Sequence, residues 1–292
     1  MSYLAKKWDY RTATAVATTL LLWASAFAGI RAALKSYSPG HLALLRFLVA
    51  SAALAAYAIL THMHLPERRD LPGIALMGFL GITVYHLALN YGEVSVSAGS
   101  ASFIVNAAPI FTAVFATAFL GERLKLWGWA GIAVSFTGVS LIALGEGEGL
   151  HFNSGAMLIL VAALATSLYF ILQKRLLRKY QALALTTYGI WFGTAIMLVL
   201  SPGLPAAVRS APLPATGAIV YLGLFPAAVA YVTWAYALSR GPASKAASFL
   251  FLTPLLATTI AWFWLGEKPT LLALLGGLMA LTGVILVNTH GR

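Results

Sequence analysis

The second half of this chain repeats its first half at a constant offset of 145 residues, without a gap. The matched positions are glycines, tyrosines, prolines and a Leu-Gly-Glu triplet: Gly78 and Gly223, Tyr91 and Tyr236, Pro109 and Pro254, and residues 120–122 and 265–267. Self-similarity at a fixed period is typical of an internal duplication. The sequence therefore predicts two related units, over residues 1–148 and 149–292.

The composition indicates that the chain folds in lipid. Hydrophobic residues make up 60% of the chain and charged residues 9%, whereas soluble domains average about 25% charged residues. The apolar stretches are about 20 residues long, which as helix spans a bilayer core of about 30 Å. The expected helices cover residues 12–34, 40–61, 72–91, 97–120, 126–145, 154–174, 182–201, 214–238, 243–265 and 270–289.

These two observations together predict the architecture. Each copy holds five expected spans, and an odd number of spans places the second copy upside down relative to the first. The predicted fold is an all-α polytopic membrane protein with ten transmembrane helices in two inverted five-helix repeats around a central cavity. Inverted repeats packed around a midplane site are typical of secondary transporters.

Charge asymmetry between the loops predicts the orientation. Alternate loops and the termini on one side hold fourteen positive residues, the other side holds four, and Arg46 lies inside a span. The positive side is cytoplasmic, so both termini are expected in the cytoplasm. The net charge of +11 is therefore interpreted as contact with anionic lipid headgroups, and no nucleic-acid partner is expected.

Acidic residues are scarce, and their placement excludes several classes of enzyme. The aspartates are Asp9 and Asp70, both in predicted cytoplasmic segments, and Glu93 is expected at the outer end of the third span rather than inside it. Membrane enzymes that need paired acidic groups for acid–base work or Mg²⁺ cannot be assembled from these positions. Glu122 and Glu267, each preceding a helix, are interpreted as helix caps. No enzyme activity, cofactor or metal site is expected.

Two other ionisable residues lie away from the ends of the predicted spans. His86 follows Tyr85 in the third span, where it either hydrogen-bonds a neighbouring helix or meets protons or substrate. Arg46 lies in the second span, near enough to its outer end to snorkel. Its favoured interpretation is a structural arginine that braces helices, with substrate contact as the alternative.

Prolines and glycines occupy equivalent positions in the two units. Pro109 and Pro254 fall inside the fourth and ninth spans, where each can kink its helix, and a symmetric pair of hinges would serve rocking between inward-open and outward-open states. The fifth and tenth spans carry small residues that allow close helix packing, either within the chain or at a dimer seam: Gly128, Gly131, Gly138, Gly276, Gly277 and Gly283.

Aromatic and uncharged polar residues predict the substrate site. Trp23 and Phe27 share a helix face by i, i+4 spacing, and Tyr231 and Trp234 share one by i, i+3 spacing. A cavity of rings with a few hydrogen-bonding groups suits an amphipathic or aromatic solute, whereas a phosphate would need several basic residues. The candidate substrate-binding residues are Trp23, Phe27, Tyr85, His86, Asn106, Tyr169, Tyr231, Trp234 and Ser248.

Several short motifs resemble one transporter family along nearly the whole chain. They are Trp-Ala-Ser-Ala-Phe at 23–27, Leu-Arg-Phe at 45–47, Asn-Ala-Ala-Pro at 106–109 and the Leu-Gly-Glu triplets. Together they resemble the ten-helix EamA branch of the drug/metabolite transporter superfamily, and Tyr85-His86 is most similar to the YddG-type aromatic amino acid exporters. The resemblance implies a ten-helix basket with a central cavity and efflux of aromatic amino acids or related metabolites.

The sequence thus predicts a secondary carrier that exports neutral, aromatic amino acids or related metabolites across a bacterial inner membrane. The rings would pack the substrate side chain, while Asn106, His86 and Ser248 would meet its amine and carboxylate. Because no buried carboxylate is expected, uniport is the simplest mode, with His86 as the fallback proton site. Efflux of drugs or metabolites such as purines, with proton coupling, is the alternative. The partners are a small molecule and the bilayer; the oligomeric state is left open and is compatible with a monomer.

Overall fold

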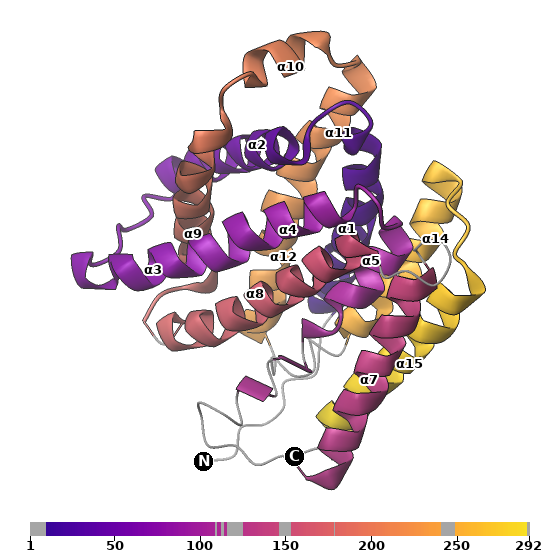
Figure 1. Ribbon diagram of the computed structural model, residues 1–292. Helices are drawn as coiled ribbons and strands as arrows, with labels where there is room; N and C mark the ends of the chain where they lie inside the picture. The colour runs from indigo at the N-terminus through magenta and orange to yellow at the C-terminus, as the bar shows by residue number, and fades with distance from the viewer. Residues whose placement is uncertain are drawn as a thin grey trace, which may run out of the picture.

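The computed structural model of the chain describes residues 10–108, 110–111, 114–115, 125–145, 153–177, 179–240 and 249–290. All of the regular elements in these ranges are helices (Figure 1). Six of the described helical segments are long and apolar enough to cross a membrane, and three shorter apolar helices accompany them. The expectation of an all-α polytopic membrane protein is therefore confirmed.

The helices follow the order that the sequence predicts, with several interruptions. The first unit holds α1 (Tyr10–Leu34), α2 (Pro39–Leu60), a 3₁₀ turn (Arg68–Asp70), α3 (Leu71–Gly78), a π turn (Phe79–Val84), α4 (Tyr85–Gly92), α5 (Ala98–Val105) and α7 (Leu126–Gly145). The second unit holds α8 (Ser154–Leu176), α9 (Ala182–Met197), a 3₁₀ turn (Leu198–Leu200), α10 (Leu204–Ser210), α11 (Leu213–Leu224), a π turn (Phe225–Val229), α12 (Ala230–Arg240), a 3₁₀ turn (Phe249–Leu252), α14 (Thr253–Leu265) and α15 (Leu271–His290). The short helix α10 has no counterpart among the expected spans.

Local sequence explains where α2 begins. The Ser38 hydroxyl accepts a hydrogen bond from the backbone N–H of His41 at 3.3 Å, which satisfies one of the donors left free at a helix start. Pro39 follows at the first helical position, where its missing N–H costs nothing. The Ser-Pro pair therefore accounts for two of the backbone positions that a helix start leaves without a partner.

Helices α7 and α15 lie side by side and form the most extensive helix pair of the structure (Figure 1). A Cβ atom added to Gly138 would lie 2.4 Å from the Gly276 carbonyl oxygen, and one added to Gly283 would lie 2.4 Å from the Gly131 carbonyl oxygen. Residue numbers rise along α7 as they fall along α15, so the two helices are antiparallel. The expected glycine stripe thus packs within the chain, where only glycine allows this approach.

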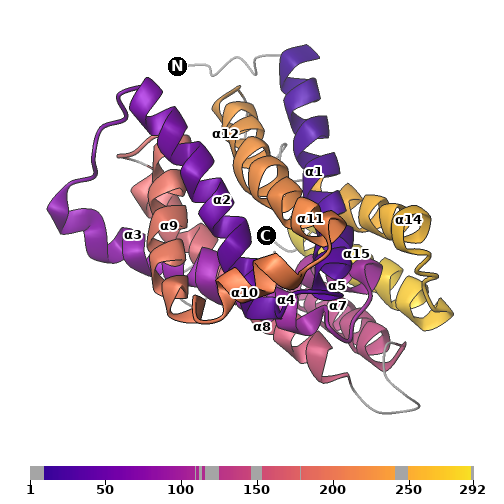
Figure 2. The same ribbon diagram turned by 90° about the horizontal axis from the view of Figure 1, so that it is seen from above.

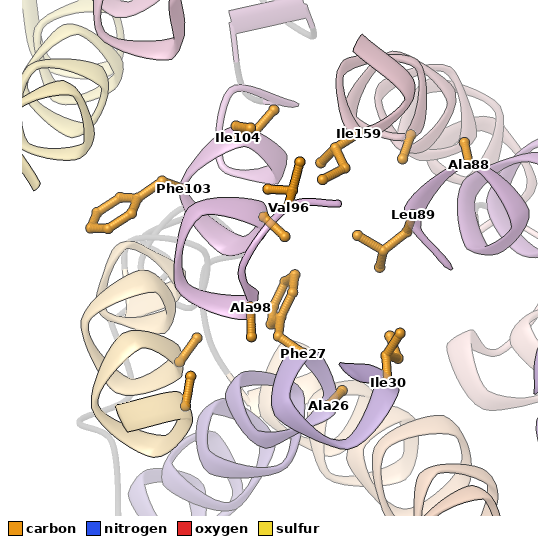
Figure 3. Packing of buried hydrophobic residues seen from close by; sticks show 14 of the residues in the cluster. Ala26, Phe27, Ile30, Ala88, Leu89, Val96, Ala98, Phe103, Ile104 and Ile159 are labelled. Atoms are coloured by element: carbon orange, nitrogen blue, oxygen red, sulfur yellow. The ribbon is translucent and has the colours of Figure 1, made fainter. Parts of the chain in front are cut away.

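Helix α1 lies against elements of both units. It packs on α5 from the first unit and on α11, α12 and α14 from the second (Figure 2). Phe27 points from α1 toward Ala98 at the start of α5, in an apolar core that also contains Ile30, Leu89 and Ile159 (Figure 3). Phe27 is 6% exposed, so the structure places this predicted substrate residue in the apolar packing between α1 and its neighbours.

Candidate substrate site

Both long middle spans change to π geometry at equivalent repeat positions. The π turns Phe79–Val84 and Phe225–Val229 end at residues 145 apart, and such turns often mark functional sites because they disturb the helical hydrogen-bond ladder. In the first turn, a Cβ at Gly81 would lie 2.3 Å from the Tyr169 ring. In the second, the Pro226 carbonyl accepts a hydrogen bond from the Trp23 indole N–H at 3.2 Å. Aromatic side chains thus contact both turns.

Three of the predicted aromatic residues form one group, which we call the ring group: Trp23, Tyr231 and Trp234. The Trp23 and Tyr231 ring centroids lie 5.7 Å apart in an edge-to-face arrangement, and those of Trp23 and Trp234 lie 5.4 Å apart. Close by, the Thr19 and Thr233 hydroxyls share a 2.7 Å hydrogen bond. The ring group joins α1 to α12.

A second group lies between α2 and α4 and contains Arg46, Phe47, Tyr85 and His86. The His86 ring centroid lies 4.4 Å from that of Phe47 and 4.6 Å from that of Tyr85. The Arg46 guanidinium carbon lies 5.4 Å from the Phe47 ring centroid, within the range of a cation–π contact. Tyr231 packs against the apolar core cluster that contains Phe47, which places the second group near the ring group.

Four polar side chains along this second group are buried and lack partners for some atoms. Arg46 and His86 are each 4% exposed, and Asn90 and Glu93 are fully buried. In the described part of the chain, no hydrogen-bond partner is present for Arg46 Nε and Nη1, both His86 ring nitrogens, Asn90 Oδ1 or either Glu93 carboxyl oxygen. The bracing bonds expected of Arg46 are therefore not made by these two donors. The expectation that no carboxylate is buried is also wrong, because Glu93 is enclosed where α4 ends.

The remaining predicted site residues are distributed around these groups. Tyr169 is buried on α8 beside the first π turn, and its hydroxyl accepts a 2.7 Å hydrogen bond from Gln173. Asn106 follows the end of α5 and donates to the Ser102 carbonyl at 2.9 Å. Ser248 lies outside the described residues. Tyr169 thus lies on α8 and Asn106 at the end of α5, whereas the ring group is formed by α1 and α12.

One of the two predicted hinges, Pro254, lies in the described part of the chain, and it differs from the expectation of a kink inside a continuous helix. Pro254 lies in the first turn of α14, directly after the 3₁₀ turn Phe249–Leu252, so its missing N–H leaves no α-helical bond unmade. Pro109 lies outside the described residues, although α5 ends shortly before it at Val105. The α-helix therefore begins at Thr253, one residue before Pro254, and the hinge role remains a prediction.

At the predicted outer side, an ion pair ties three segments together. Arg31 Nε on α1 lies 2.9 Å from Glu267 Oε1 in the loop before α15, and Arg31 also donates to the Val94 carbonyl at 3.0 Å. The other Glu267 oxygen accepts from the backbone N–H of Ala98 at the start of α5, at 2.9 Å. Glu267 thus caps α5. The sequence had predicted that it would cap the helix that follows it, α15. The reason is that the ends of α1, α5 and α14 converge in the fold.

At the predicted cytoplasmic side, a second network joins the loop before α3 to the loop before α9. Lys179 Nζ contacts Glu67 Oε2 at 2.6 Å and also pairs with Asp70, whose carboxylate accepts from the Tyr180 hydroxyl at 2.6 Å. Arg69 lies 2.7 Å from the same Glu67 oxygen. The hydrogen bond from Lys179 lowers the pKa of the Glu67 carboxyl below its usual value. This network is solvated, so its individual pairs contribute little stability.

Two hollows open beside α1. One, of about 540 Å³, lies near the C-terminal end of α1 between α11 and α14, with Lys35, Tyr221 and Trp264 in its wall. The other, of about 420 Å³, lies near the N-terminal end of α1, between α1 and α12, with Arg11, Thr14 and Thr233 in its wall. The ring group lies between these two levels along α1, since Trp23 is central in that helix.

Helices of membrane-spanning length that enclose buried polar and aromatic groups define a polytopic membrane protein with an internal polar site. The EamA-like transporter family model matches the chain twice, over residues 11–144 and 153–289. The chain therefore belongs to the EamA-like transporter family, and it is a multi-pass membrane transporter.

Comparison with known proteins agrees with this assignment. An uncharacterized transporter, YdfC of Bacillus subtilis, is 48% identical over 90% of this chain and 86% of its own length. A probable terminal-alkyne amino-acid exporter of Streptantibioticus cattleyicolor is 41% identical over 95% of this chain and 94% of its own length. One crystal structure aligns with a TM-score of 0.61 and 19% identity over 94% of this chain and 95% of its own, which supports the fold alone.

Proposed function

We propose that this transporter exports neutral amino acids with aromatic or similarly unsaturated side chains across the cytoplasmic membrane. The observation that carries the proposal is the ring group of Trp23, Tyr231 and Trp234 near the buried polar residues Arg46 and His86. Rings stabilise an unsaturated side chain, while buried polar atoms without partners favour a ligand that supplies them. The similarity to a probable terminal-alkyne amino-acid exporter adds support.

We further propose ten spans in two inverted repeats that alternate between inward-open and outward-open states. The antiparallel packing of α7 and α15 supports inversion, because these helices have bounds 145 residues apart and run in opposite directions. The paired π turns support it too. Ion networks lie at the two predicted membrane faces, one around Arg31 and one around Lys179. A rocking motion would break the network on the side that opens and keep the network on the side that stays closed.

Export from cells tests the substrate class. Cells that express the protein are fed a phenylalanine dipeptide, and the efflux of labelled phenylalanine is followed. We expect faster efflux than in cells without the protein, and a loss of that gain in a Trp23→Ala, Trp234→Ala double variant. The matched control is Trp129→Ala, because Trp129 is 51% exposed on α7. Efflux equal to that of cells without the protein, or a double variant as active as the control, would contradict the proposal.

Proton-coupled export is a second candidate, because the structure shows a buried carboxyl at Glu93. The argument for uniport depended on the absence of such a group. Comparing efflux with and without an imposed pH gradient separates the two modes: uniport does not respond to the gradient, whereas coupled export does.

A further inference from the structure

The face of α4 that turns toward α2 carries three polar residues in register. His86, Asn90 and Glu93 are spaced i, i+4 and i+7, so they lie on one side of the helix. Ring contact between His86 and Phe47, and a 3.2 Å hydrogen bond from Asn90 Nδ2 to the Pro39 carbonyl, show that this side faces α2. The same two contacts show that α2 and α4 run antiparallel.

Because α2 and α4 are antiparallel, the usual direction of helical side chains brings Arg46 and Glu93 toward each other across this interface. Side chains on a helix tilt toward its N-terminus, so Arg46 on α2 points toward the level of Pro39, and Glu93 points back toward Asn90. Both side chains are buried at this interface, no ion pair joins them in the described structure, and the atoms named above remain without partners. Arg31 also reaches Glu93, but it donates to the Glu93 backbone carbonyl, and its side chain is already paired with Glu267.

A buried cation and a buried carboxyl that face each other without contact are costly unless something lies between them. The unpartnered atoms define what fits: donors at Arg46, acceptors at Asn90 Oδ1 and Glu93, and a ring at His86 that can do either. An α-amino acid carries a carboxylate beside an ammonium, and it matches this sequence of donors and acceptors while leaving the enclosed charge at zero.

On the basis of the proposed function, we propose that Arg46 binds the α-carboxylate of the substrate and that Glu93, with Asn90 Oδ1, binds its α-ammonium group. The α2–α4 interface then recognises the part that all amino acids share, while the ring group selects the side chain. The sequence predicted the amine and carboxylate contacts jointly for Asn106, His86 and Ser248. In this proposal Arg46 binds the carboxylate, because its guanidinium geometry suits a carboxylate better than an amide or a hydroxyl does.

Binding to the purified full-length protein tests this assignment with three ligands. Labelled L-phenylalanine is displaced by unlabelled phenylalanine, by 2-phenylethylamine, which lacks the carboxylate, or by 3-phenylpropionate, which lacks the ammonium group. For the wild type we expect both analogues to bind roughly 10- to 100-fold more weakly than phenylalanine, as for the loss of one charge-assisted hydrogen-bonded contact.

The variants must respond in opposite ways. Each variant's affinities are measured by direct calorimetric titration, so that weak phenylalanine binding does not hide the others. We expect Arg46→Gln to weaken phenylalanine and 3-phenylpropionate roughly 10- to 100-fold while 2-phenylethylamine is unchanged. We expect Glu93→Gln to weaken phenylalanine and 2-phenylethylamine while 3-phenylpropionate is unchanged. Arg69→Gln and Glu67→Gln, from the solvated pair at the cytoplasmic side, serve as matched controls and change none of the three affinities.

Two results would contradict the assignment. If each variant weakens all three ligands by the same factor, Arg46 and Glu93 act only through the fold. If the wild type binds either analogue as tightly as phenylalanine, the missing group is not recognised; this comparison needs no variant and so remains decisive if Arg46→Gln does not fold. Absence of phenylalanine binding by the wild type would overturn the proposed function together with this assignment, whereas the first two results leave amino acid export standing.

Discussion

Replacing Gly138 by alanine should destabilise the protein by separating α7 from α15. The added Cβ would lie 2.4 Å from both the Ala280 nitrogen and the Gly276 carbonyl oxygen. These are backbone atoms that cannot rotate away, so the helices must move about 1 Å apart to restore a normal contact near 3.5 Å. Overpacking of this kind costs about 1–3 kcal/mol, and lipid offers no hydrophobic force to close the gap again.

Gly217 provides the matched control for this substitution. It lies in α11, and an added Cβ would meet no atom within 4 Å, so Gly217→Ala should gain about 0.5–1 kcal/mol from the better helix propensity of alanine. Thermal unfolding of both variants in the same detergent measures the difference. We expect a lower Tm than wild type for Gly138→Ala and an equal or higher Tm for Gly217→Ala. A Gly138→Ala protein as stable as the wild type would refute the close packing.

Three further outcomes follow from the structure. Trp23→Phe keeps a ring but removes the indole donor to the second π turn. The free energy of unfolding should therefore fall by about 1 kcal/mol, and an unchanged Tm would show that the bond is not formed. The hydrogen bond from Lys179 lowers the pKa of Glu67. The ionised Glu67 therefore stabilises the fold at pH values above the usual glutamate pKa, and this stabilisation disappears as the pH falls through the lowered pKa of the folded state. Wild type should therefore unfold at a higher temperature than Glu67→Gln at neutral pH, and this difference should vanish in acid; a difference independent of pH would contradict the ionised contact. Since the chain contains no cysteine, a membrane-impermeant maleimide should label Ser36→Cys but not Thr61→Cys in intact cells, and the reverse pattern would invert the predicted orientation.

Repetition in the sequence predicted much of the helical framework. The expected helix 126–145 matches α7 (Leu126–Gly145), and α15 (Leu271–His290) lies 145 residues further on, because both copies keep the glycines that their close packing requires. The π turns were not predicted, since π geometry has no periodic signature in an apolar run. Gly81, which accommodates Tyr169, is the local signal that could have indicated the first turn.

The candidate site was predicted less completely, because its residues come from helices that are distant in the sequence. Spacing within one helix correctly paired Tyr231 with Trp234, and the contact of both with Trp23 required the fold. The same kind of spacing placed Phe27 beside Trp23, but Phe27 packs into the core with α5. Glu93 was predicted at a helix end, where it does lie, but its burial could not be predicted because it involves α1, whose Arg31 donates to the Glu93 backbone carbonyl.

Transport by purified protein in liposomes tests the central claim most directly. Uptake of labelled phenylalanine, tryptophan and alanine is measured against liposomes without protein, with and without a pH gradient. We predict saturable uptake of phenylalanine and tryptophan that exceeds that of alanine, since the ring group of Trp23, Tyr231 and Trp234 favours unsaturated side chains. No uptake above protein-free liposomes for any of the three amino acids would contradict the proposed substrate class, while membership of the transporter family would stand.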